Sequence, residues 1–405
     1  MYAVVSKTLF MKQLMNVNRI LSLSTAICLT ALSGQAQDKE QAAFHKSLIV
    51  VDGHNDVIYE SILPGKDIGQ RLKSGHTDLP RLLEGGVDVQ VFAVWSDDKK
   101  FGKGKAFKHA NAQIDALERM LEKNASLIGL AKNSAEIEDL LQQGKVVAII
   151  GVEGGNMIES STENLEALYK RGARYLTLTW NYNLPWATAA AMEVKAAANA
   201  SKGLTKAGEA IIRKMNALGM MVDLSHGGEQ TFYDVLAITS KPILVSHSNA
   251  YALMPHYRNL KDKQLEALKK NGGVIGVNFY SGFLDPKFND RVQQLYKQHF
   301  GAKANNKLSA TRKYEKLPLK LKRQADAPLE KLLEHIDYLV KKVGIDHVAI
   351  GSDYDGIESA PQQLEDVSKF PVLTAALLKR GYSKADVAKI MGQNFLRILK
   401  ENEGN

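Results

Sequence analysis

The sequence predicts an α/β fold with a single barrel domain, a (β/α)8 or TIM barrel, and three observations lead to it. Short apolar runs rich in β-branched residues alternate with stretches of helical periodicity, glycine follows many of these stretches, and several runs end at a histidine or a carboxylate. This repeated order is typical of a parallel sheet, and eight strands favour a closed barrel over an open sheet. A chain of 405 residues suffices for one barrel with an insertion.

The apolar runs predict eight strands, over residues 48–51, 87–94, 146–152, 175–179, 220–224, 243–245, 274–279 and 347–350. Helical periodicity predicts helices over 106–121, 134–143, 162–171, 205–218, 230–239, 262–270 and 329–343. Five glycines stand just after helices, where a positive φ is often needed: Gly144, Gly172, Gly219, Gly272 and Gly344. His335 falls within the last of these helices, and we expect it to be structural.

A basic insertion, at about 281–325, precedes the last predicted strand. Its residues 281–323 contain eleven Lys or Arg against three acids. A connection of this length inside a barrel is typical of a lid, a binding loop or an inserted helical hairpin. A solvated insertion and a substrate-gating role both remain open.

The N-terminus has the pattern of a signal peptide over residues 1–36, so we expect an exported protein, periplasmic or secreted. Two basic residues precede the apolar stretch 20–32, and small residues follow up to Ala36, so the mature chain of 37–405 would begin at Gln37. The single cysteine, Cys28, raises the alternative of a lipoprotein tether, but the residue before it fits a lipobox poorly. No other segment has the apolar length of a membrane span.

Charge and glycine patterns exclude two classes of partner. The net charge is +9, but the basic runs are mixed with Glu and Leu, as on solvated helix faces, and no aromatic-interleaved basic motif indicates nucleic-acid binding. The glycine-rich segment 151–155 lacks the Lys-Ser/Thr of a nucleotide loop, and no dinucleotide fingerprint occurs. The glycines are better explained as space around Glu153.

Polar side chains stand at the C-terminal ends of five predicted strands, and a parallel barrel delivers all such ends to one rim. The set suits a divalent metal and hydrolysis, which indicates a barrel of the metal-dependent hydrolase type. It consists of His54, Asp56, Glu153, His226, His247 and Asp353.

The individual signals differ in strength. His54 and Asp56 are two residues apart, on one side of an extended chain, although this spacing alone is weak evidence. Glu153 is the sole acid at an apolar strand end, where an unpaired carboxylate would be costly. A single strand-end histidine is more often structural, but two on consecutive strands together with acids favour a metal site. Asp355 competes with Asp353 for any catalytic role.

The motifs at these strand ends resemble those of the membrane (renal) dipeptidase family of zinc peptidases. The resemblance runs in order from about residue 48 to about residue 398 and includes the segments 51–56, 151–155, 175–179, 223–226, 245–248 and 351–356. It implies two zinc ions. By this resemblance His54 and Asp56 hold one zinc, His226 and His247 hold the other, and Glu153 bridges them together with a hydroxide.

The resemblance also implies roles in hydrolysis of short peptides. Arg258 matches the family's arginine that binds the free C-terminal carboxylate of the substrate, and Asp353 matches its proton-transferring acid/base. The chain departs from the family where Trp180 stands in place of a frequent histidine. Trp180 either contacts the substrate or only packs at the rim, and Asn181 or Asn183 could supply a replacement polar contact.

Two alternatives to a zinc dipeptidase remain. One is a related amidohydrolase acting on N-acyl amino acids or small amides, although such enzymes commonly begin with His-x-His rather than the His54-x-Asp56 found here. The other is an inactive exported metal-binding protein, which the retention of Asp353 argues against. The expected partner is a small peptide substrate, and a homodimer is an open expectation.

Overall fold

The computed structural model describes residues 39–97, 99–101, 104–197, 199–301, 314 and 317–403. They belong to two units: the first ends at Ser47 and is helical over 39–46, and the second spans Leu48–Asn405. The signal peptide expected at 1–36 lies outside the described residues. Among the helices of the described ranges, none combines the length and apolarity needed to cross a membrane.

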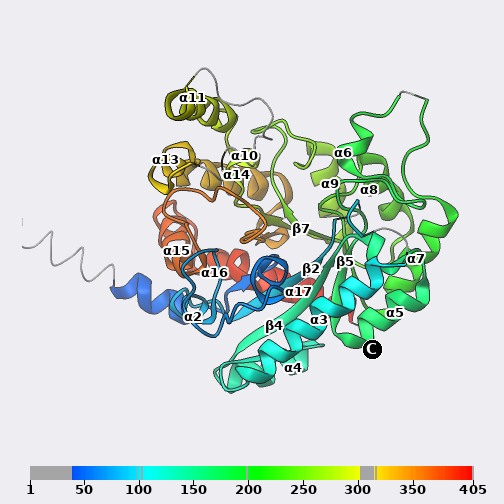
Figure 1. The fold of residues 1–405 in the computed structure, drawn as a ribbon, viewed down its shortest axis with the longest axis horizontal. Helices are drawn as coiled ribbons and strands as arrows, with labels where there is room; N and C mark the ends of the chain where they lie inside the picture. Colours follow the sequence, from blue (N-terminus) through cyan, green and yellow to red (C-terminus); the bar gives the residue numbers. More distant parts are fainter. Residues whose placement is uncertain are drawn as a thin grey trace, which may run out of the picture. The chain divides into compact units, whose positions relative to one another are not determined.

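Eight parallel strands of the second unit pair in sequence order around a barrel (Figure 1). The ring is completed by a hydrogen bond of 2.9 Å from Gly53 N–H to Ile350 O and by a parallel bridge between Asn55 and Tyr354. The predicted TIM barrel is therefore confirmed. Its strands are β1 (Val51–Asp52), β2 (Val89–Trp95), β4 (Val146–Glu153), β5 (Ala173–Thr177), β6 (Met221–Asp223), β7 (Leu244–Ser248), β8 (Val274–Val277) and β9 (Val348–Ile350).

One further strand, β3 (Ile128–Leu130), was not predicted. It pairs with the start of β4, from Val146 onward, while β5 pairs with β4 only from Ile150. β3 therefore occupies an edge that the barrel leaves free. Its three residues are Ile, Gly and Leu, and a central glycine weakens the strand signal of so short a segment.

The seven predicted helices are present with ends within two residues of the prediction, and all five glycines after them have a positive φ. They are α3 (Ala106–Lys123), α4 (Ser134–Gln142), α5 (Thr162–Arg171), α7 (Lys206–Leu218), α8 (Glu229–Ile238), α9 (Asp262–Asn271) and α14 (Leu329–Val343). Shorter or later elements were not predicted: η1 (Ile58–Ile62), α2 (Leu79–Glu84), η2 (Gly155–Ile158), α6 (Ala190–Glu193), η3 (Ile345–His347), η4 (Val367–Lys369), α15 (Phe370–Lys379), α16 (Lys384–Ala388), η5 (Lys389–Gln393) and α17 (Asn394–Asn402).

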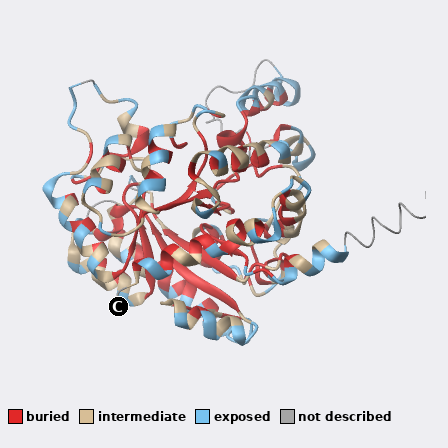
Figure 2. Cartoon of the chain, turned by 180° about the vertical axis from the view of Figure 1, so that it is seen from behind, coloured by how far each residue is buried: buried red, intermediate tan, exposed pale blue. Residues whose placement is uncertain are grey.

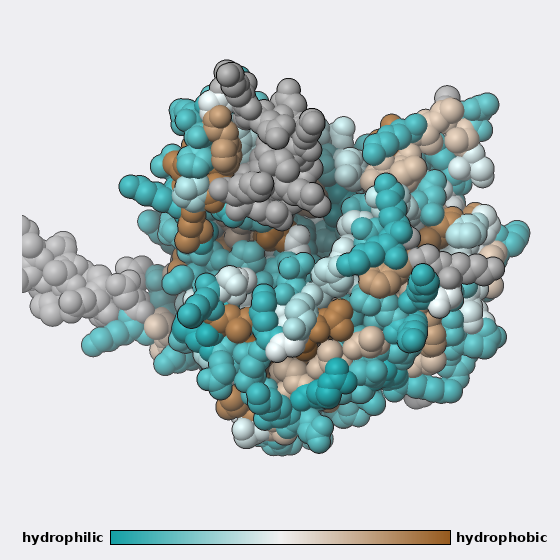
Figure 3. Space-filling model, viewed as in Figure 1, coloured by the Kyte–Doolittle hydropathy of each residue, from teal (hydrophilic) through white to brown (hydrophobic). Residues whose placement is uncertain are grey.

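Helix α5 illustrates how the local sequence sets these elements. Ser161 caps it by accepting a hydrogen bond from the N–H of Asn164, and Leu165 and Leu168 form its buried face. Gly172, at φ 116°, ends the helix in a conformation that disfavours other residues, and β5 begins at the next residue. The strands are buried while the helices expose their outer faces (Figure 2). On the face in Figure 3, hydrophilic residues predominate and apolar ones form scattered patches.

Helix α17 packs against the barrel interior. Its residues Phe395, Ile398 and Leu399 share one apolar cluster with side chains of the strands, including Val91 of β2 and Ile149 of β4. The opposite, C-terminal rim of the strands carries the polar residues that the sequence singles out.

The basic insertion is helical in its described part, with α10 (Ser281–Leu284), α11 (Phe288–Phe300) and α13 (Leu319–Ala325). The insertion has a small apolar cluster of its own, in which Phe288 and Val292 of α11 lie with Tyr314 and Leu317, two residues that precede α13. The described part is thus helical, and the choice between a lid, a binding loop and an inserted helical hairpin stays a prediction. A gating role stays a prediction.

Candidate metal and active site

All six residues that the strand ends offered lie together at the C-terminal rim. They contribute to three overlapping groups, and in each the candidate ligand atoms lie within 4.8 Å of one another. Four of the six border a cavity of about 490 Å³, and His54 and His247 lie buried behind them. The groups are His54, Asp56 and Glu153; Glu153, His226 and His247; and His54, His247 and Asp353.

Glu153 belongs to two of these groups and lies between them. Its Oε2 is 3.4 Å from His54 Nε2, while its Oε1 is 2.9 Å from His226 Nε2 and 3.7 Å from His247 Nε2. Asp56 Oδ2 approaches His54 Nε2 at 3.5 Å. One carboxylate thus has a different set of ligand atoms next to each of its two oxygens.

The histidines turn their Nε2 atoms into the site because their Nδ1 atoms have other partners. His54 Nδ1 is 2.7 Å from the hydroxyl of Tyr175, and His247 Nδ1 is 2.8 Å from Ser246 Oγ. His226 Nδ1 is 3.3 Å from Asn181 Oδ1. Such partners on the far ring nitrogen orient metal-binding histidines.

Unsatisfied atoms in this arrangement fit bound cations. Within the described residues, His54 Nε2 and Asp56 Oδ1 are buried without a hydrogen-bond partner, which is costly unless another ligand satisfies them. The Nε2 atoms of His226 and His247 lie only 3.1 Å apart. The donor set of imidazoles and carboxylates therefore fits divalent metal ions.

The electrostatics of His226, His247 and Glu153 agree with this fit, whereas the pKa of His54 shifts in the other direction. Burial lowers the pKa of His226 to about 4, aided by the positive charge of Arg258, and burial lowers the pKa of His247 as well. Both imidazoles are therefore neutral, as metal binding requires. Burial alone would raise the pKa of Glu153, but the nearby His54 and the hydrogen bonds from His226 and His54 hold this pKa below its ordinary value. Burial lowers the pKa of His54, but a buried tyrosine and the nearby acids raise it well above its ordinary value.

Two buried carboxylates that the sequence analysis did not assign support the ligand loops. Asp223 accepts hydrogen bonds from the N–H groups and the hydroxyls of Ser225 and Ser246, the residues that precede two of the histidines. Asp52 accepts from the N–H and hydroxyl of Ser352 at 2.8 and 2.7 Å. These bonds tie the C-terminal ends of neighbouring strands together behind the metal ligands.

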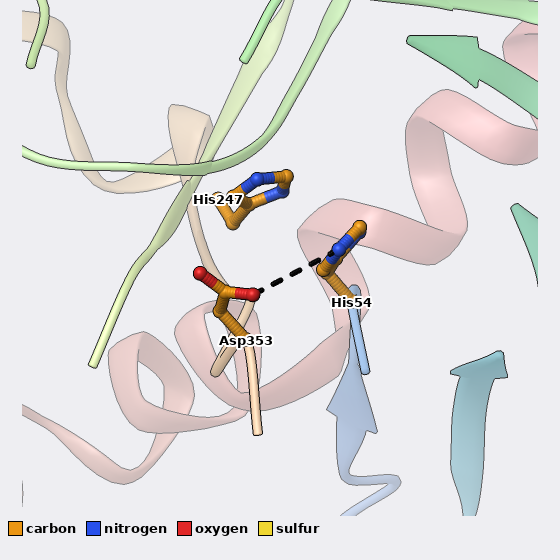
Figure 4. Close-up of side chains that lie close together, drawn as sticks. All are labelled: His54, His247 and Asp353. Carbon is orange, nitrogen blue, oxygen red and sulfur yellow. Dashed lines mark ion pairs between the residues drawn. The ribbon is translucent and has the colours of Figure 1, made fainter. Parts of the chain in front are cut away.

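Asp353 faces the candidate ligands, whereas Asp355 does not. Asp353 Oδ1 is 3.9 Å from His54 Nε2, and its carboxyl group lies beside the ring of His247 (Figure 4). Burial raises the pKa of Asp353 well above its ordinary value. Asp355 Oδ1 instead accepts a hydrogen bond of 2.8 Å from the backbone N–H of His76. The geometry thus places Asp353, the acid chosen from the sequence, beside the candidate ligands and its competitor Asp355 away from them.

The backbone at this acid is close to the ligands and strained. Asp353 has a φ of 63°, in the left-handed region that few residues other than glycine adopt. A Cβ on Gly356 would lie 2.1 Å from Asp56 Oδ2 and 2.6 Å from Asp353 Oδ1. Glycine at 356 is therefore what allows the two carboxylates to converge.

Arg258 is buried, with 6% of its surface exposed, and borders the same cavity. Its Nε–H donates to Ser225 O at 2.7 Å and its Nη2 donates to His247 O at 3.2 Å. The described part of the chain offers no acceptor to Nη1, so one edge of the guanidinium remains available. That edge could bind a carboxylate.

Of the three residues suggested for substrate contact, two border the cavity and one does not. Trp180 borders the cavity edge-on to Trp95, with 5.0 Å between the rings. Asn181 also borders it, although its Oδ1 lies near His226. Asn183 Oδ1 instead accepts from the N–H of Ala189 and stays within its loop.

Aromatic residues of the cavity wall were missed by the sequence analysis. Trp95 is the last residue of β2, so the strand-end rule that found the ligands could also have found it. The others come from short helices or loops, where the sequence has no periodic signal, and they include Tyr59 of η1, Tyr257, Tyr280 and Phe283 of α10.

Comparison with known proteins agrees with this site. Residues 38–405 match the family model described as membrane dipeptidase, peptidase family M19. A dipeptidase, tcpJ, from Claviceps purpurea is 31% identical over 370 residues, which cover 87% of this chain and 76% of the relative.

Solved structures of metallopeptidases are also similar to this chain. A metallopeptidase from Rhodobacter sphaeroides, solved with a phosphinate mimic of the dipeptide L-Ala-D-Ala, is 27% identical with a TM-score of 0.72, covering 88% of this chain and 99% of that one. The metallopeptidase called dipeptidase AC is 28% identical with a TM-score of 0.71, covering 89% and 100%. The resemblance seen in the sequence is confirmed: the chain belongs to the membrane dipeptidase family, peptidase family M19, and is a peptide-bond hydrolase.

Proposed function

We propose that this protein is a dipeptidase that uses two zinc ions to hydrolyse short peptides with a free C-terminal carboxylate. The observation that carries the proposal is the position of Glu153, whose two oxygens face two different ligand groups. His54 and Asp56 would hold one ion, His226 and His247 the other, and Glu153 would bridge them. Imidazole and carboxylate ligands suit zinc.

When bound, the two ions would activate a water molecule and polarise the scissile carbonyl. The chain's own residues supply the rest. Asp353 takes up the proton that the attacking water releases and passes it to the leaving amine, a role that its position beside the ligand groups supports. Arg258 holds the substrate carboxylate with its free edge, which orients the peptide bond toward the ligand groups.

Trp180 and Asn181 would shape the part of the cavity next to His226. Trp180 can donate a hydrogen bond through its indole N–H but cannot titrate, so we assign it to substrate selection rather than proton transfer. Its edge-on contact with Trp95 makes this wall aromatic, which should affect the choice of side chain more than the requirement for a carboxylate.

A hydrolysis panel with metal analysis tests this function. It compares L,L- and L,D-dipeptides, one N-acyl amino acid and one tripeptide, with zinc content measured on the same preparation. We expect two zinc ions per chain and the fastest cleavage for a dipeptide. Equal cleavage of the N-acyl amino acid would favour the amidohydrolase alternative, and a zinc-loaded protein without activity would favour the binding-protein alternative.

We also propose export of the protein, on the basis of the basic, apolar and small-residue order within residues 1–36. Mass spectrometry of the mature protein should find an N-terminus near Gln37. A diacylglyceryl group on Cys28 would instead identify a membrane-tethered lipoprotein. Light scattering of the purified protein tests the homodimer.

A further inference from the structure

Asn278 is the first residue after β8, and it contacts the proposed acid/base. It is fully buried, and its Nδ2 donates a hydrogen bond of 2.8 Å to Asp353 Oδ2. Within the described residues, β8 and its C-terminal end contribute no member to the three ligand groups. The contribution of this strand to the site is therefore its contact with Asp353.

The orientation of the Asn278 amide follows from its second partner. Its Oδ1 accepts a hydrogen bond of 2.6 Å from the backbone N–H of Tyr280. A backbone N–H can only donate, so the amide oxygen must face Tyr280 and the NH2 group must face Asp353. The backbone of Asn278 is also fixed, because its N–H donates to Ser248 O and its C=O accepts from Asn249 Nδ2.

This orientation distinguishes the two oxygens of Asp353. An amide NH2 cannot accept a proton, so Oδ2 must remain a hydrogen-bond acceptor while the contact lasts. A hydroxyl oxygen is a poorer acceptor than a carbonyl or carboxylate oxygen, so this contact favours a proton on Oδ1, the oxygen that lies 3.9 Å from His54 Nε2. The contact also opposes rotation of the carboxyl group, at a residue whose backbone is strained.

We propose that Asn278 is a positioning residue that reserves Asp353 Oδ1 for proton transfer. The proposal rests on the proposed function. The proton released by the attacking water moves to Oδ1, and it then moves from Oδ1 to the leaving nitrogen as the C–N bond breaks. Asn278 itself neither gains nor loses a proton and does not touch the substrate.

Two substitutions test the proposal in the full-length, zinc-loaded protein. Asn278→Ala removes the donor, and Asn278→Asp keeps the shape but places a second carboxyl group against Oδ2, which draws the proton to the wrong oxygen. For both we expect kcat to fall roughly 10- to 100-fold, the range found when residues that orient a site's ligands are replaced. KM and zinc content should remain close to those of the unmodified protein.

Asn394→Ala is a matched control. Asn394 is also buried and donates through Nδ2 to Ile345 O and Val348 O, at 2.7 Å each, at the start of β9. Its loss removes buried hydrogen bonds near the strand that leads to Asp353 without touching Asp353. We expect a lower melting temperature but an unchanged kcat.

A double substitution identifies the route of the effect. If Asn278 acts through Asp353, Asn278→Ala should reduce kcat no further in an Asp353→Asn background. The proposal is overturned if kcat stays within about twofold in both Asn278 variants, if only KM or zinc content changes, or if the losses in the double variant multiply. Near-normal activity of Asp353→Asn alone would instead overturn the role of Asp353 in the proposed function.

Discussion

Replacing Arg258 with alanine should strongly reduce dipeptide hydrolysis, because it removes the charge that would bind the substrate carboxylate. The guanidinium is buried, and the backbone oxygens of Ser225 and His247 already occupy one side of it. A substrate carboxylate at the free edge would therefore form a desolvated ion pair. Truncating one partner of such a pair costs about 2–5 kcal/mol, which corresponds to a roughly 30- to 4000-fold loss in kcat/KM.

The assay compares a dipeptide with its C-terminal amide, in the unmodified protein and in Arg258→Ala. Both substrates present the same scissile bond, so damage to the metal site would lower both rates, whereas loss of the carboxylate contact lowers only the rate for the acid. Arg258→Lys should be intermediate, because lysine keeps the charge but lacks the planar fork. Zinc content is measured because His247 O loses a donor in the alanine variant.

Two results would refute this reasoning. If the unmodified protein cleaves dipeptide amides as well as the free acids, no carboxylate contact contributes to catalysis, and the amidohydrolase alternative takes precedence. If Arg258→Ala lowers both rates by the same factor with zinc content intact, the arginine has a structural role only.

Three further predictions concern metal binding, proton transfer and stability. Glu153→Gln should lower the zinc content and reduce activity by orders of magnitude, since an amide offers one oxygen where two carboxylate oxygens now face histidines; full occupancy at near-normal rates would contradict the bridging role. Asp353→Asn should keep the zinc but lower kcat by roughly 10²- to 10⁴-fold, and a larger loss in Asp355→Asn would mean that the wrong acid was chosen. Burial lowers the pKa of His335 to about 4, so its stabilising contribution is complete above the pKa of an unfolded histidine, about 6.5, and is lost as the pH falls toward 4, by up to about 3 kcal/mol. The free energy of unfolding, measured with urea, should therefore fall more steeply between about pH 6.5 and 4 in the unmodified protein than in His335→Gln. Parallel plots of this free energy against pH would count against the assignment.

The sequence was sufficient for the barrel because its main elements carry local signals. The seven predicted helices have an apolar face, and five of them are followed within two residues by a glycine with a positive φ, so both features lie within one segment. His335 was also predicted correctly as structural: it accepts from the N–H of Ala250 and lies 3.1 Å from Leu284 O. The short helices were missed because a few residues show no helical periodicity, and β3 was missed because a glycine interrupts its three residues.

The candidate ligands could be predicted because a parallel barrel brings strand ends to one rim, whatever their separation in sequence. The residues that orient them could not, since their roles depend on partners far away in the chain. Asp52 meets Ser352, 300 residues later, and Tyr175 meets His54 across 121 residues. Asn278 in the sequence is only a polar residue within the predicted strand 274–279, and its contact with Asp353 emerges from the closed barrel.

The hydrogen bond that closes the ring between Gly53 and Ile350 has a consequence for the kinetics of unfolding. The seam it belongs to joins the two barrel strands that are most distant in sequence, and such pairings carry the largest loop-closure entropy. The same seam runs through the ligand loop, because Asp56 N–H donates to Tyr354 O and Asp353 N–H donates to His54 O. A cation held by His54 and Asp56 would therefore stabilise the loop that pairs with Asp353 and Tyr354 across this seam. Chelation should shorten the lifetime of the folded barrel as well as abolish its activity, because opening would no longer have to wait for the ion to dissociate.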